Sequence, residues 1–545
     1  MSAATQTPPL PLPAPVTVWR PRANRWAVAL TVTLATFMEV LDTSIANVAL
    51  PHIAGGLGAS ADEATWVLTS YLVANAVILP MSAYLTTFVG RKRFYMICVV
   101  LFGLSSALCG LAPSLPLLIF FRILLGAGGG GLAPSEQAIL ADTFEPKDRG
   151  KAFAVYGIAV VCAPAIGPTL GGYITDNFDW RWIFFINVPV AILSLFLTNR
   201  IVEDPPHIVA QVKELQKTGL NLDFVGFGLL AVGFGSLEFV LDKGQEDDWF
   251  GSRVITFFIV ACVVSLGTLI AWELRQIRTG HKPILDLTLF KRRNFAVAFV
   301  LMFILGSSLF GTTVLIPQFV QALLGYTAEQ AGLVISPGGV GIILLMPLVG
   351  FLVAKVDARF LVAYGFFSCS VAMFFMLNLD LDVNYGYVAW LRVFQASGLA
   401  FLFVPISTIS FAGMPPNKSN DVSGLTNLAR NIGGSVGTAF LVTALARRAQ
   451  FHQHRLADHL VGSNAAMQSQ ATMLGRYLHD RGGIAYSVAQ GRTMAQGSLM
   501  RQLVVQATML SYIDVIKCFA VAMLVMVPVV FLMGKVKGGR GGGGH

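Results

Sequence analysis

Two carboxylic acids and one arginine lie inside stretches of the sequence that are otherwise apolar. Glu39 and Asp42 are three residues apart, so a helix places both on one face. Arg122 lies in a later apolar stretch. Ionisable groups inside membrane segments are costly and are therefore functional candidates. A carboxylate beside an arginine stays ionised, whereas one in apolar surroundings binds a proton more readily, and a proton carrier needs both conditions.

The depth of these residues indicates which of them meet. At about 1.5 Å per residue, Asp42 lies about 12 Å and Arg122 about 10 Å from the outer ends of their helices. We therefore expect Asp42 to pair with Arg122 and Glu39 to lie one turn deeper, and we assign all three to proton coupling. The alternative is a structural ion pair that only locks the two helices together.

Other polar residues inside apolar stretches are weaker candidates. The predicted lining of a substrate cavity consists of Asn47, Glu136, Gln137, Arg392 and Arg430. Glu136 lies near the cytoplasmic mouth of its helix, and Arg430 is long enough to reach the membrane surface instead. Asp514 and Lys517 are expected to pair near the outer end of the last helix.

Nucleotide and metal sites are not predicted. Gly126, Gly128 and Gly131 spell G-x-G-x-x-G, but they lie in an apolar helix without a preceding strand, so they indicate a thin helix face and not a dinucleotide site. No G-x-x-x-x-G-K-[ST] loop occurs, which excludes an ATP motor in this chain. The six cysteines form no C-x-x-C pair, so neither a disulfide framework nor a zinc site is indicated.

The elements that hold the candidate residues must lie in a membrane. Of 545 residues, 55% are hydrophobic and 12% are charged, where a soluble protein carries about 25% charged residues. With a mean hydropathy of +0.68, the composition excludes a long soluble enzyme. The net charge of +9 does not indicate nucleic-acid binding, because the basic residues cluster between apolar segments.

The apolar stretches predict an all-α polytopic membrane protein with fourteen transmembrane helices. The predicted spans are 26–50, 66–88, 94–112, 117–140, 152–174, 182–200, 222–241, 254–272, 294–318, 331–354, 359–378, 387–410, 422–446 and 512–533. We divide them into an N-terminal bundle of six helices (26–200), a linker with two extra helices (201–293) and a C-terminal bundle of six helices (294–533).

Charge places both ends of the chain in the cytoplasm. Lys and Arg concentrate in the even-numbered connections and the tails, whereas the short opposite loops hold Arg181, Lys243 and Arg253. Residues 1–25 are expected to form a disordered cytoplasmic arm and 534–545 a glycine-rich cytoplasmic tail. Residues 447–511 are expected to form a periplasmic loop. Its histidines, His452, His454 and His459, fit a solvated loop better than a metal site.

Three short patterns recur about 270 residues apart, which predicts an internal repeat. Asn47 to Pro51 recurs as Thr313 to Pro317, Pro80 to Val89 as Pro347 to Val356, and Arg122 with Gly128 and Pro134 as Arg392 with Gly398 and Pro405. The alternative is chance similarity among apolar helices. Two parallel halves with two helices inserted between them explain the spacing, and transporters of this kind hold substrate at the midplane between the halves.

At these residues the chain resembles the fourteen-span drug:proton antiporter branch of the major facilitator superfamily, and within it the multidrug resistance protein B (EmrB) type. The likeness covers nearly the whole chain. It rests on Leu41 to Pro51 (LDTSIANVALP), Arg122 with Gly126, Gly167 to Gly172 (GPTLGG), Trp182 to Pro189 (WIFFINVP), Asp247 to Trp249 (DDW), Gly433 to Thr438 (GGSVGT) and the glycine-rich tail.

The resemblance implies the major facilitator fold, with two six-helix bundles and two inserted helices. It matches Asp42 to the family's membrane acid and Arg122 to its basic residue. Gly167, Pro168, Gly171 and Gly172 match the antiporter motif, which we expect where the fifth span meets the other half. The resemblance also implies a periplasmic adaptor of the membrane-fusion type and an outer-membrane channel as partners.

The sequence departs from the family pattern after the second span. Ala83 and Thr87 stand where the family usually has Gly and Asp, although Gly90, Arg91 and Lys92 remain. The usual charge relay at this loop is therefore in doubt. Glu39 is an acid beyond the family's minimum motif, and we expect it to influence the choice of cargo or the number of protons.

These observations favour a proton-coupled multidrug efflux antiporter that exports lipophilic or amphipathic toxic compounds across the bacterial inner membrane. The proton gradient drives it, and we expect no cofactor, bound metal or enzymatic activity. The first alternative is an exporter dedicated to one compound class, such as fatty acids or a natural product. A more remote alternative is a membrane sensor that transports nothing.

Overall fold

The computed structural model describes residues 21–218, 223–458, the pairs 468–469, 472–473 and 476–477, and 488–534. These residues form α-helices joined by turns and three short 3-10 helices, without a β-strand among them. Most of the predicted arm 1–25 and of the predicted tail 534–545 lies outside the described residues. Within the described chain, thirteen helical segments are long and apolar enough to cross a membrane.

The first half of the chain forms six spans, which correspond to the predicted bundle 26–200. Its helices are α1 (Arg25–Leu57), α2 (Ala61–Val89), α3 (Arg91–Gly110), α4 (Leu115–Gly129), α5 (Leu132–Thr143), α6 (Arg149–Asn177), α7 (Trp182–Phe185) and α8 (Asn187–Ile201). α4 and α5 together form one span that is interrupted at Gly130 and Gly131, and α7 and α8 form another.

The last half contains α12 (Arg293–Leu324), α13 (Ala328–Leu352), α14 (Ala358–Met376), α15 (Tyr385–Ser410), α16 (Ser419–Ala457) and α18 (Val488–Val530). The predicted span 422–446 lies in α16, which is not among the thirteen apolar segments. Its apolar part is short, because it lies between Arg430 and Arg447. α16 nevertheless packs extensively against α12 and α18, so it completes the fourteen spans.

The two halves repeat the same local structure, as the internal repeat predicts. α1 ends at Gly58 and α12 ends at Gly325, and both glycines adopt positive φ values that terminate the helix. The next helix then begins with a capping box, formed by Ser60 with Glu63 in α2 and by Thr327 with Gln330 in α13.

Two further helices of membrane length stand between the halves in the sequence. They are α10 (Phe224–Lys243) and α11 (Arg253–Thr279), and the short amphipathic α9 (Pro206–Thr218) precedes them. α10 packs against α2, α11 and, less extensively, α16. α11 exposes many large apolar side chains, among them Phe257, Val260 and Val263, which suits a lipid-facing helix.

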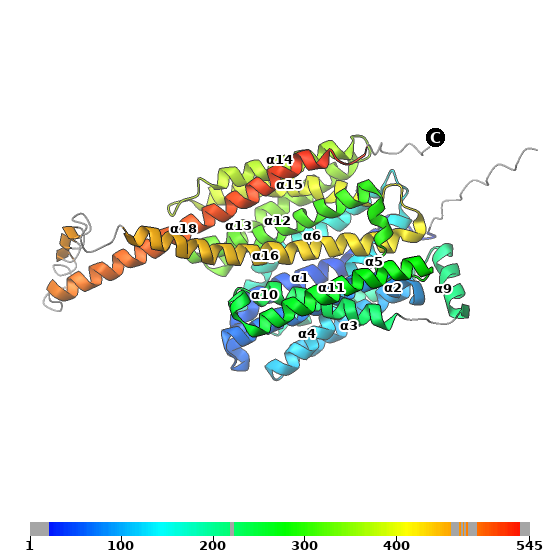
Figure 1. Cartoon of the computed structure of the whole chain (residues 1–545), viewed down its shortest axis with the longest axis horizontal. Helices are drawn as coiled ribbons and strands as arrows, with labels where there is room; N and C mark the ends of the chain where they lie inside the picture. Colours follow the sequence, from blue (N-terminus) through cyan, green and yellow to red (C-terminus); the bar gives the residue numbers. More distant parts are fainter. Residues whose placement is uncertain are drawn as a thin grey trace, which may run out of the picture.

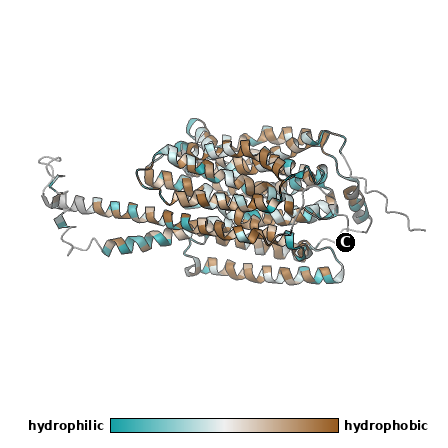
Figure 2. Ribbon diagram, turned by 90° about the horizontal axis from the view of Figure 1, so that it is seen from above, coloured by the Kyte–Doolittle hydropathy of each residue, from teal (hydrophilic) through white to brown (hydrophobic). Residues whose placement is uncertain are grey.

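The halves meet along a continuous apolar core. α6 of the first half packs along α13 of the second, and this is among the most extensive helix contacts in the molecule. In Figure 1 the helices run side by side, with α9 and the end of α18 at Val530 at one extremity of the bundle. Hydrophobic residues dominate the middle of the bundle, whereas polar residues concentrate toward its extremities (Figure 2).

The predicted outer loop 447–511 is helical at both of its ends, which corrects the sequence-based expectation. α16 continues to Ala457 and α18 begins at Val488. With 39 and 43 residues, each helix is about 60 Å long, twice the thickness of a hydrocarbon core. Both project beyond the other helices at the extremity opposite α9 (Figure 1). A hydropathy criterion finds only the membrane part of such a helix, because the projecting part is polar.

Candidate functional site

The centre of the first half contains a buried ion pair between α1 and α4. Arg122 Nη1 donates a hydrogen bond to Asp42 Oδ2 at 2.7 Å, and the two residues are 0% and 2% exposed. Asn187 Nδ2 donates to the other carboxylate oxygen, Oδ1, at 2.8 Å. Both oxygens of Asp42 are therefore bonded, one by a charged donor and one by a neutral donor.

The surrounding helices fix the orientation of Arg122. Its Nε donates to the Val67 carbonyl at 2.9 Å, and its guanidinium lies 4.5 Å from the centre of the Tyr71 ring. α4 can approach α2 this closely because Gly126, one turn after Arg122, has no side chain; a Cβ there would overlap the Tyr71 carbonyl oxygen. The glycine pattern of this helix thus serves close packing, which holds Arg122 against α1 and α2.

Glu39 lies one turn from Asp42 and faces α2. Tyr71 Oη donates to Glu39 Oε1 at 3.0 Å, and Asn75 Nδ2 donates to the same oxygen at 3.3 Å. Tyr71 therefore contacts both predicted proton-coupling groups, since its ring lies under Arg122 and its hydroxyl binds Glu39. Glu39 forms no ion pair among the described residues.

Two of the predicted cavity residues lie in one buried polar network between the halves, and a third lies next to them in the sequence. Gln137 Oε1 accepts a hydrogen bond from Asn427 Nδ2 at 2.8 Å. Tyr156 Oη donates to Asn427 Oδ1 at 3.0 Å and accepts from Arg430 Nη1 at 2.8 Å. Arg430 therefore points into the protein and not to the membrane surface. Beside Gln137, Glu136 Oε1 accepts from Thr33 at 2.5 Å, while Glu136 Oε2 has no hydrogen-bond partner among the described residues.

The other two predicted cavity residues lie apart from this network. Arg392 is 4% exposed and donates to Thr312, Thr313 and Gln395 at 2.7 to 3.2 Å. It forms no ion pair within the described chain. Asn47 is an exposed residue of α1, about three turns before the helix ends at Leu57. The structure thus brings Gln137 and Arg430 into one network and leaves Asn47 and Arg392 outside it.

The glycines of the antiporter motif face a different helix from the one expected. A Cβ at Gly167 would overlap Ser44, and a Cβ at Gly171 would lie 3.2 Å from Ile45 Cγ2, so both glycines face α1 within the same half. Contact with the other half comes through Thr169, whose hydroxyl lies 3.2 Å from the Ser336 hydroxyl on α13. Gly172 is the motif glycine nearest to α13. The sequence does not define the rotation of α6, and the expectation was wrong for Gly167 and Gly171.

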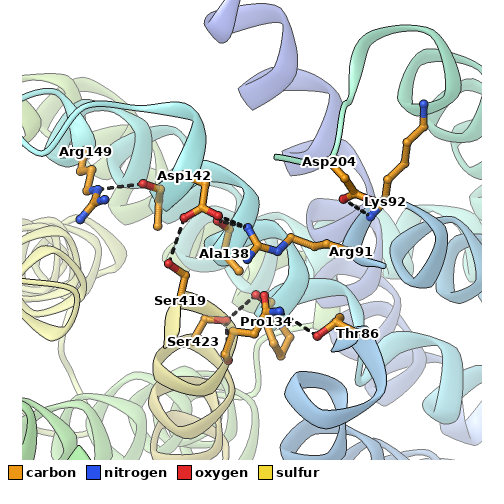
Figure 3. Close-up of polar contacts among 12 residues, drawn as sticks. Thr86, Arg91, Lys92, Pro134, Ala138, Asp142, Arg149, Asp204, Ser419 and Ser423 are labelled. Carbon is orange, nitrogen blue, oxygen red and sulfur yellow. Dashed lines mark hydrogen bonds and ion pairs between the residues drawn. The ribbon is translucent and has the colours of Figure 1, made fainter. Parts of the chain in front are cut away.

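A second polar cluster closes the extremity of the bundle where α5 meets α16 (Figure 3). Arg91 Nη1 donates to Asp142 Oδ2 at 2.7 Å and to the Ala138 carbonyl at 2.9 Å. Ser419 Oγ at the start of α16 donates to the other oxygen of Asp142 at 2.9 Å. Asp142 therefore joins an arginine of the first half to a serine of the second half.

This cluster lies at the loop where the departures at Ala83 and Thr87 put the usual charge relay in doubt. Thr87 bonds only the carbonyl of Tyr84 in its own helix. Thr86 instead accepts a hydrogen bond from Asn420 at 2.9 Å, and Ser423 donates to the Pro134 carbonyl (Figure 3). The carboxylate in this contact comes from Asp142 at the end of α5, a residue that the motif analysis did not consider.

A cavity of about 680 Å³ opens between α10, α16 and α18. Its lining is mainly apolar and includes Trp249, Val436 and Phe440, with Arg447, Arg448, Asp514 and Lys517 as its charged members. None of the five predicted cavity residues borders it. Asp514 binds Arg448 Nη2 at 2.5 Å and His452 Nε2 at 2.8 Å, so the expected pair with Lys517 is wrong. Asp514 lies on α18, and its partners Arg448 and His452 lie on the extension of α16. The sequence analysis did not predict that α16 extends this far.

The structure adds three residues to the site that the sequence analysis did not single out, namely Asn187, Tyr71 and Asn75. Asn187 lies in the segment Trp182 to Pro189, and its place as a polar residue in an apolar span was the available signal. Tyr71 and Asn75 lie one turn apart in α2, a spacing that could have indicated a polar helix face. No group of three or more His, Cys, Asp or Glu suited to a metal occurs in the described parts of the chain; His459 lies outside them.

Comparison with known proteins agrees with this architecture. The sequence profile of the Major Facilitator Superfamily matches residues 32–438. The chain is 35% identical to the multidrug export protein EmrB of Escherichia coli (strain K12), with 95% of this chain and 97% of that protein covered. It is 36% identical to the fatty acid resistance protein FarB of Neisseria gonorrhoeae, again over 95% and 97% of the two chains.

Among solved structures, the chain resembles the proton:xylose symporter XylE with a TM-score of 0.56 and 16% identity, covering 94% of this chain and 97% of that one. At this identity the likeness shows the fold alone. The many apolar helices and the bacterial relatives identify a multi-pass protein of the bacterial inner membrane. The chain belongs to the major facilitator superfamily and, within it, to the EmrB type of drug transporter.

Proposed function

We propose that this protein is a proton-coupled antiporter that exports lipophilic or amphipathic toxic compounds from the cytoplasm. The observation that carries the proposal is the buried pair of Asp42 and Arg122, with Asn187 as a third partner, inside a membrane bundle. The relative named as a multidrug export protein supports the multidrug character of the cargo.

During the transport cycle, Asp42 alternates between an ionised state paired with Arg122 and a protonated state without that partner. While Arg122 stays within 2.7 Å, the carboxylate remains ionised. When the helices shift and the pair separates, a buried carboxylate without a counter-charge is costly, and proton binding removes that cost. One elementary charge that crosses 100 mV releases about 2.3 kcal/mol, enough for a roughly 50-fold gradient of uncharged cargo.

Glu39 contributes to the choice of cargo. It lies one turn from Asp42, and its partners Tyr71 and Asn75 are neutral. A carboxyl group without a cationic partner attracts a cationic compound, so Glu39→Gln weakens export of cationic compounds more than export of neutral ones. Glu136, whose Oε2 lacks a partner, is the next candidate for the same role.

We propose that both termini face the cytoplasm and that α16 and α18 project into the periplasm. The concentration of Lys and Arg in the connections near α9 supports this orientation. The projecting helices then form a docking surface for a periplasmic adaptor that leads to an outer-membrane channel. Shortening both projections by the same number of turns abolishes whole-cell resistance but leaves transport in vesicles intact; loss of both activities contradicts the docking role.

An exporter dedicated to fatty acids is the second candidate. The relative FarB is named a fatty acid resistance protein, and the cavity between α10, α16 and α18 combines apolar walls with Arg447 and Lys517. Such a lining suits an anionic amphiphile. Export of anionic amphiphiles without any export of cationic or neutral compounds favours this candidate over multidrug efflux.

The test uses proteoliposomes that contain only this protein. A pH-sensitive dye reports proton movement when cationic, neutral or anionic compounds are added on one side. Multidrug antiport predicts proton movement with compounds of more than one charge class. Movement with a single compound class supports the dedicated exporter, and transport without proton movement contradicts proton coupling.

A further inference from the structure

The first inserted helix contains a buried acid that the proposed mechanism does not use. Glu238 of α10 is 5% exposed, and Ser435 Oγ of α16 donates a hydrogen bond to its Oε1 at 2.6 Å. Within the described chain it forms no ion pair. At about 1.5 Å per residue, it lies about 8 Å from the end of α10 at Lys243, the end nearest the projecting helices.

α10 is tied to the first half, whereas Ser435 belongs to the second half. Asp242 bonds Thr69 of α2, Lys243 bonds Thr65 of α2, and Phe239 stacks on Trp66 with ring centres 5.7 Å apart. A relative movement of the two halves therefore separates α10 from α16. The hydrogen bond between Glu238 and Ser435 spans the interface that opens.

Contacts between polar groups lead from this position to Glu39, one turn from the proposed proton site at Asp42. Ser435 Oγ also lies 3.2 Å from the carbonyl of Asn431, whose side chain donates to Asn75 Oδ1 at 3.3 Å. Asn75 in turn donates to Glu39 Oε1 at 3.3 Å. A chain of three residues thus connects Glu238 on the inserted helix with Glu39 on α1.

The other charged groups near this contact have partners of their own. Asp242 lies one turn along α10 and is bound to Thr69, and Lys243 is bound to Thr65 and Glu246. On α16, Arg430 is bound to Tyr156 on its other side. α11 packs on this part of α10 through Phe258 and Ile259, and its one titratable group in the region, Cys262, is a buried thiol.

A purely structural contact would not need an acid here. Serine, asparagine or glutamine would accept the same hydrogen bond from Ser435, whereas an ionised carboxyl group buried without a cation is costly. The group is therefore stable as a neutral acid while α16 covers it. It releases the proton to water when α10 and α16 separate, because the carboxylate is then hydrated.

We propose that Glu238 is a second proton-binding site, separate from Asp42, and that it couples proton binding to closure of the periplasmic end of the transporter. A proton from periplasmic water binds Glu238 when α10 meets α16, and it returns to periplasmic water when they part. The inserted helices thus make closure sensitive to external pH. This inference rests on the proposed orientation and proton coupling.

The experiment measures the distance between α10 and α16 as a function of pH. Spin labels at positions 247 and 450, both exposed, report the separation in a Cys518→Ser background, because Cys518 is the exposed cysteine of the described chain and the others there are buried. If one proton is linked to closure, the ratio of open to closed molecules changes about tenfold per pH unit. Glu238→Gln keeps a hydrogen-bond partner for Ser435 but binds no proton, so it loses this tenfold dependence.

Three further variants distinguish the possible outcomes. Glu246→Gln changes an exposed acid of the same hairpin and retains the pH dependence. Ser435→Ala retains the dependence but lowers the closed fraction at every pH, and it tests the proposal even if Glu238→Gln is unstable. Asp42→Asn loses uphill transport and retains the pH-dependent distance. An unchanged pH dependence in Glu238→Gln overturns the inference alone, whereas proton-independent transport by the unmodified protein overturns the proposed function.

Discussion

Arg122 and Arg392 are buried arginines at matching positions of the two halves, but only Arg122 binds a carboxylate. Arg122 of α4 bonds Asp42 of α1, whereas Arg392 of α15 bonds Thr312 and Thr313 of α12. The internal repeat therefore preserves the cation and its contact with the first helix of each half. Among the described residues, a carboxylate at this contact occurs in the first half alone.

This difference predicts unequal costs for removing the two arginines. Arg122→Met leaves Asp42 buried without its counter-charge, a change that costs about 3–5 kcal/mol. Arg392→Met costs less, because Thr312 and Thr313 already bond the Ser308 and Leu309 carbonyls of their own helix. Thermal unfolding in detergent compares the two variants. Asp42→Asn combined with Arg122→Met recovers part of the loss, and an equal loss in both single variants contradicts the assignment.

Gly171 supports the proton site through α1. A leucine at this position must displace Ile45, because even its Cβ would lie 3.2 Å from Ile45 Cγ2, and overpacking of this kind costs about 1–3 kcal/mol. Gly171→Leu therefore reduces efflux while the protein still inserts into the membrane. The matched control is Gly228→Leu on α10, where a Cβ meets nothing within 4 Å. Equal efflux by both variants would falsify the role of this contact.

The cluster around Asp142 holds the halves together at the extremity that we place in the cytoplasm. Asp142→Asn leaves Arg91 buried without its carboxylate and costs about 3–5 kcal/mol. Ser419→Ala removes one neutral donor and costs about 0.5–1.5 kcal/mol. Both changes favour opening of this extremity, Asp142→Asn more strongly. Labelling of a cysteine at position 422, a buried position of α16 one turn after Ser419, measures the opening, and a greater effect of Ser419→Ala would rule out Asp142 as the centre of the contact.

Asp148, in the connection between α5 and α6, gives the protein a pH-dependent stability. Its hydrogen bond from Lys151, together with Arg25 at 3.0 Å, lowers the pKa of Asp148 below its usual value of 3.8. Because the pKa is lower in the folded state, this stabilisation is present above about pH 4 and is lost as the pH falls through the folded pKa. Asp148→Asn is therefore less stable at pH 7, and its difference from the unmodified protein disappears at strongly acidic pH.

The measurement is the unfolding temperature of both proteins from pH 7 to pH 3. Arg25→Met provides the control, because it leaves Lys151 in place and removes only part of the pH-dependent difference. A constant difference between Asp148→Asn and the unmodified protein over this range contradicts the assignment.

Much of the fold was predictable from hydropathy and repetition. Spans are long apolar stretches, and the matching features at Gly58 and Gly325 follow from the same local sequence. The pair of Asp42 and Arg122 was predictable because a buried charge is unfavourable without a partner of opposite charge. The two residues lie at similar depth in the membrane, so each can be that partner for the other. Similar reasoning failed for Asp514, since its partner Arg448 lies on a helix extension that hydropathy does not detect.

The rest of the site depends on helix rotation, which hydropathy does not define. Tyr71 and Asn75 face Glu39 in a part of the bundle where α4 packs tightly on α2 at Gly126. The same limitation explains the error at Gly167 and Gly171. Glu238 lies within the predicted span 222–241, so the cost of an acid inside a membrane segment was the available signal, whereas its partner Ser435 depends on helix rotation.

The central claim is that Asp42 carries the proton that drives export. The most direct test is substrate accumulation in proteoliposomes under an imposed pH gradient, with Asp42→Asn compared with the unmodified protein. Asp176→Asn, an exposed acid at the end of α6, serves as the control and accumulates substrate normally. We expect Asp42→Asn to bind substrate but to accumulate none, because asparagine keeps the size of the side chain and releases no proton. Accumulation by Asp42→Asn at the rate of the unmodified protein contradicts the account and would move the role to Glu39 or Glu136.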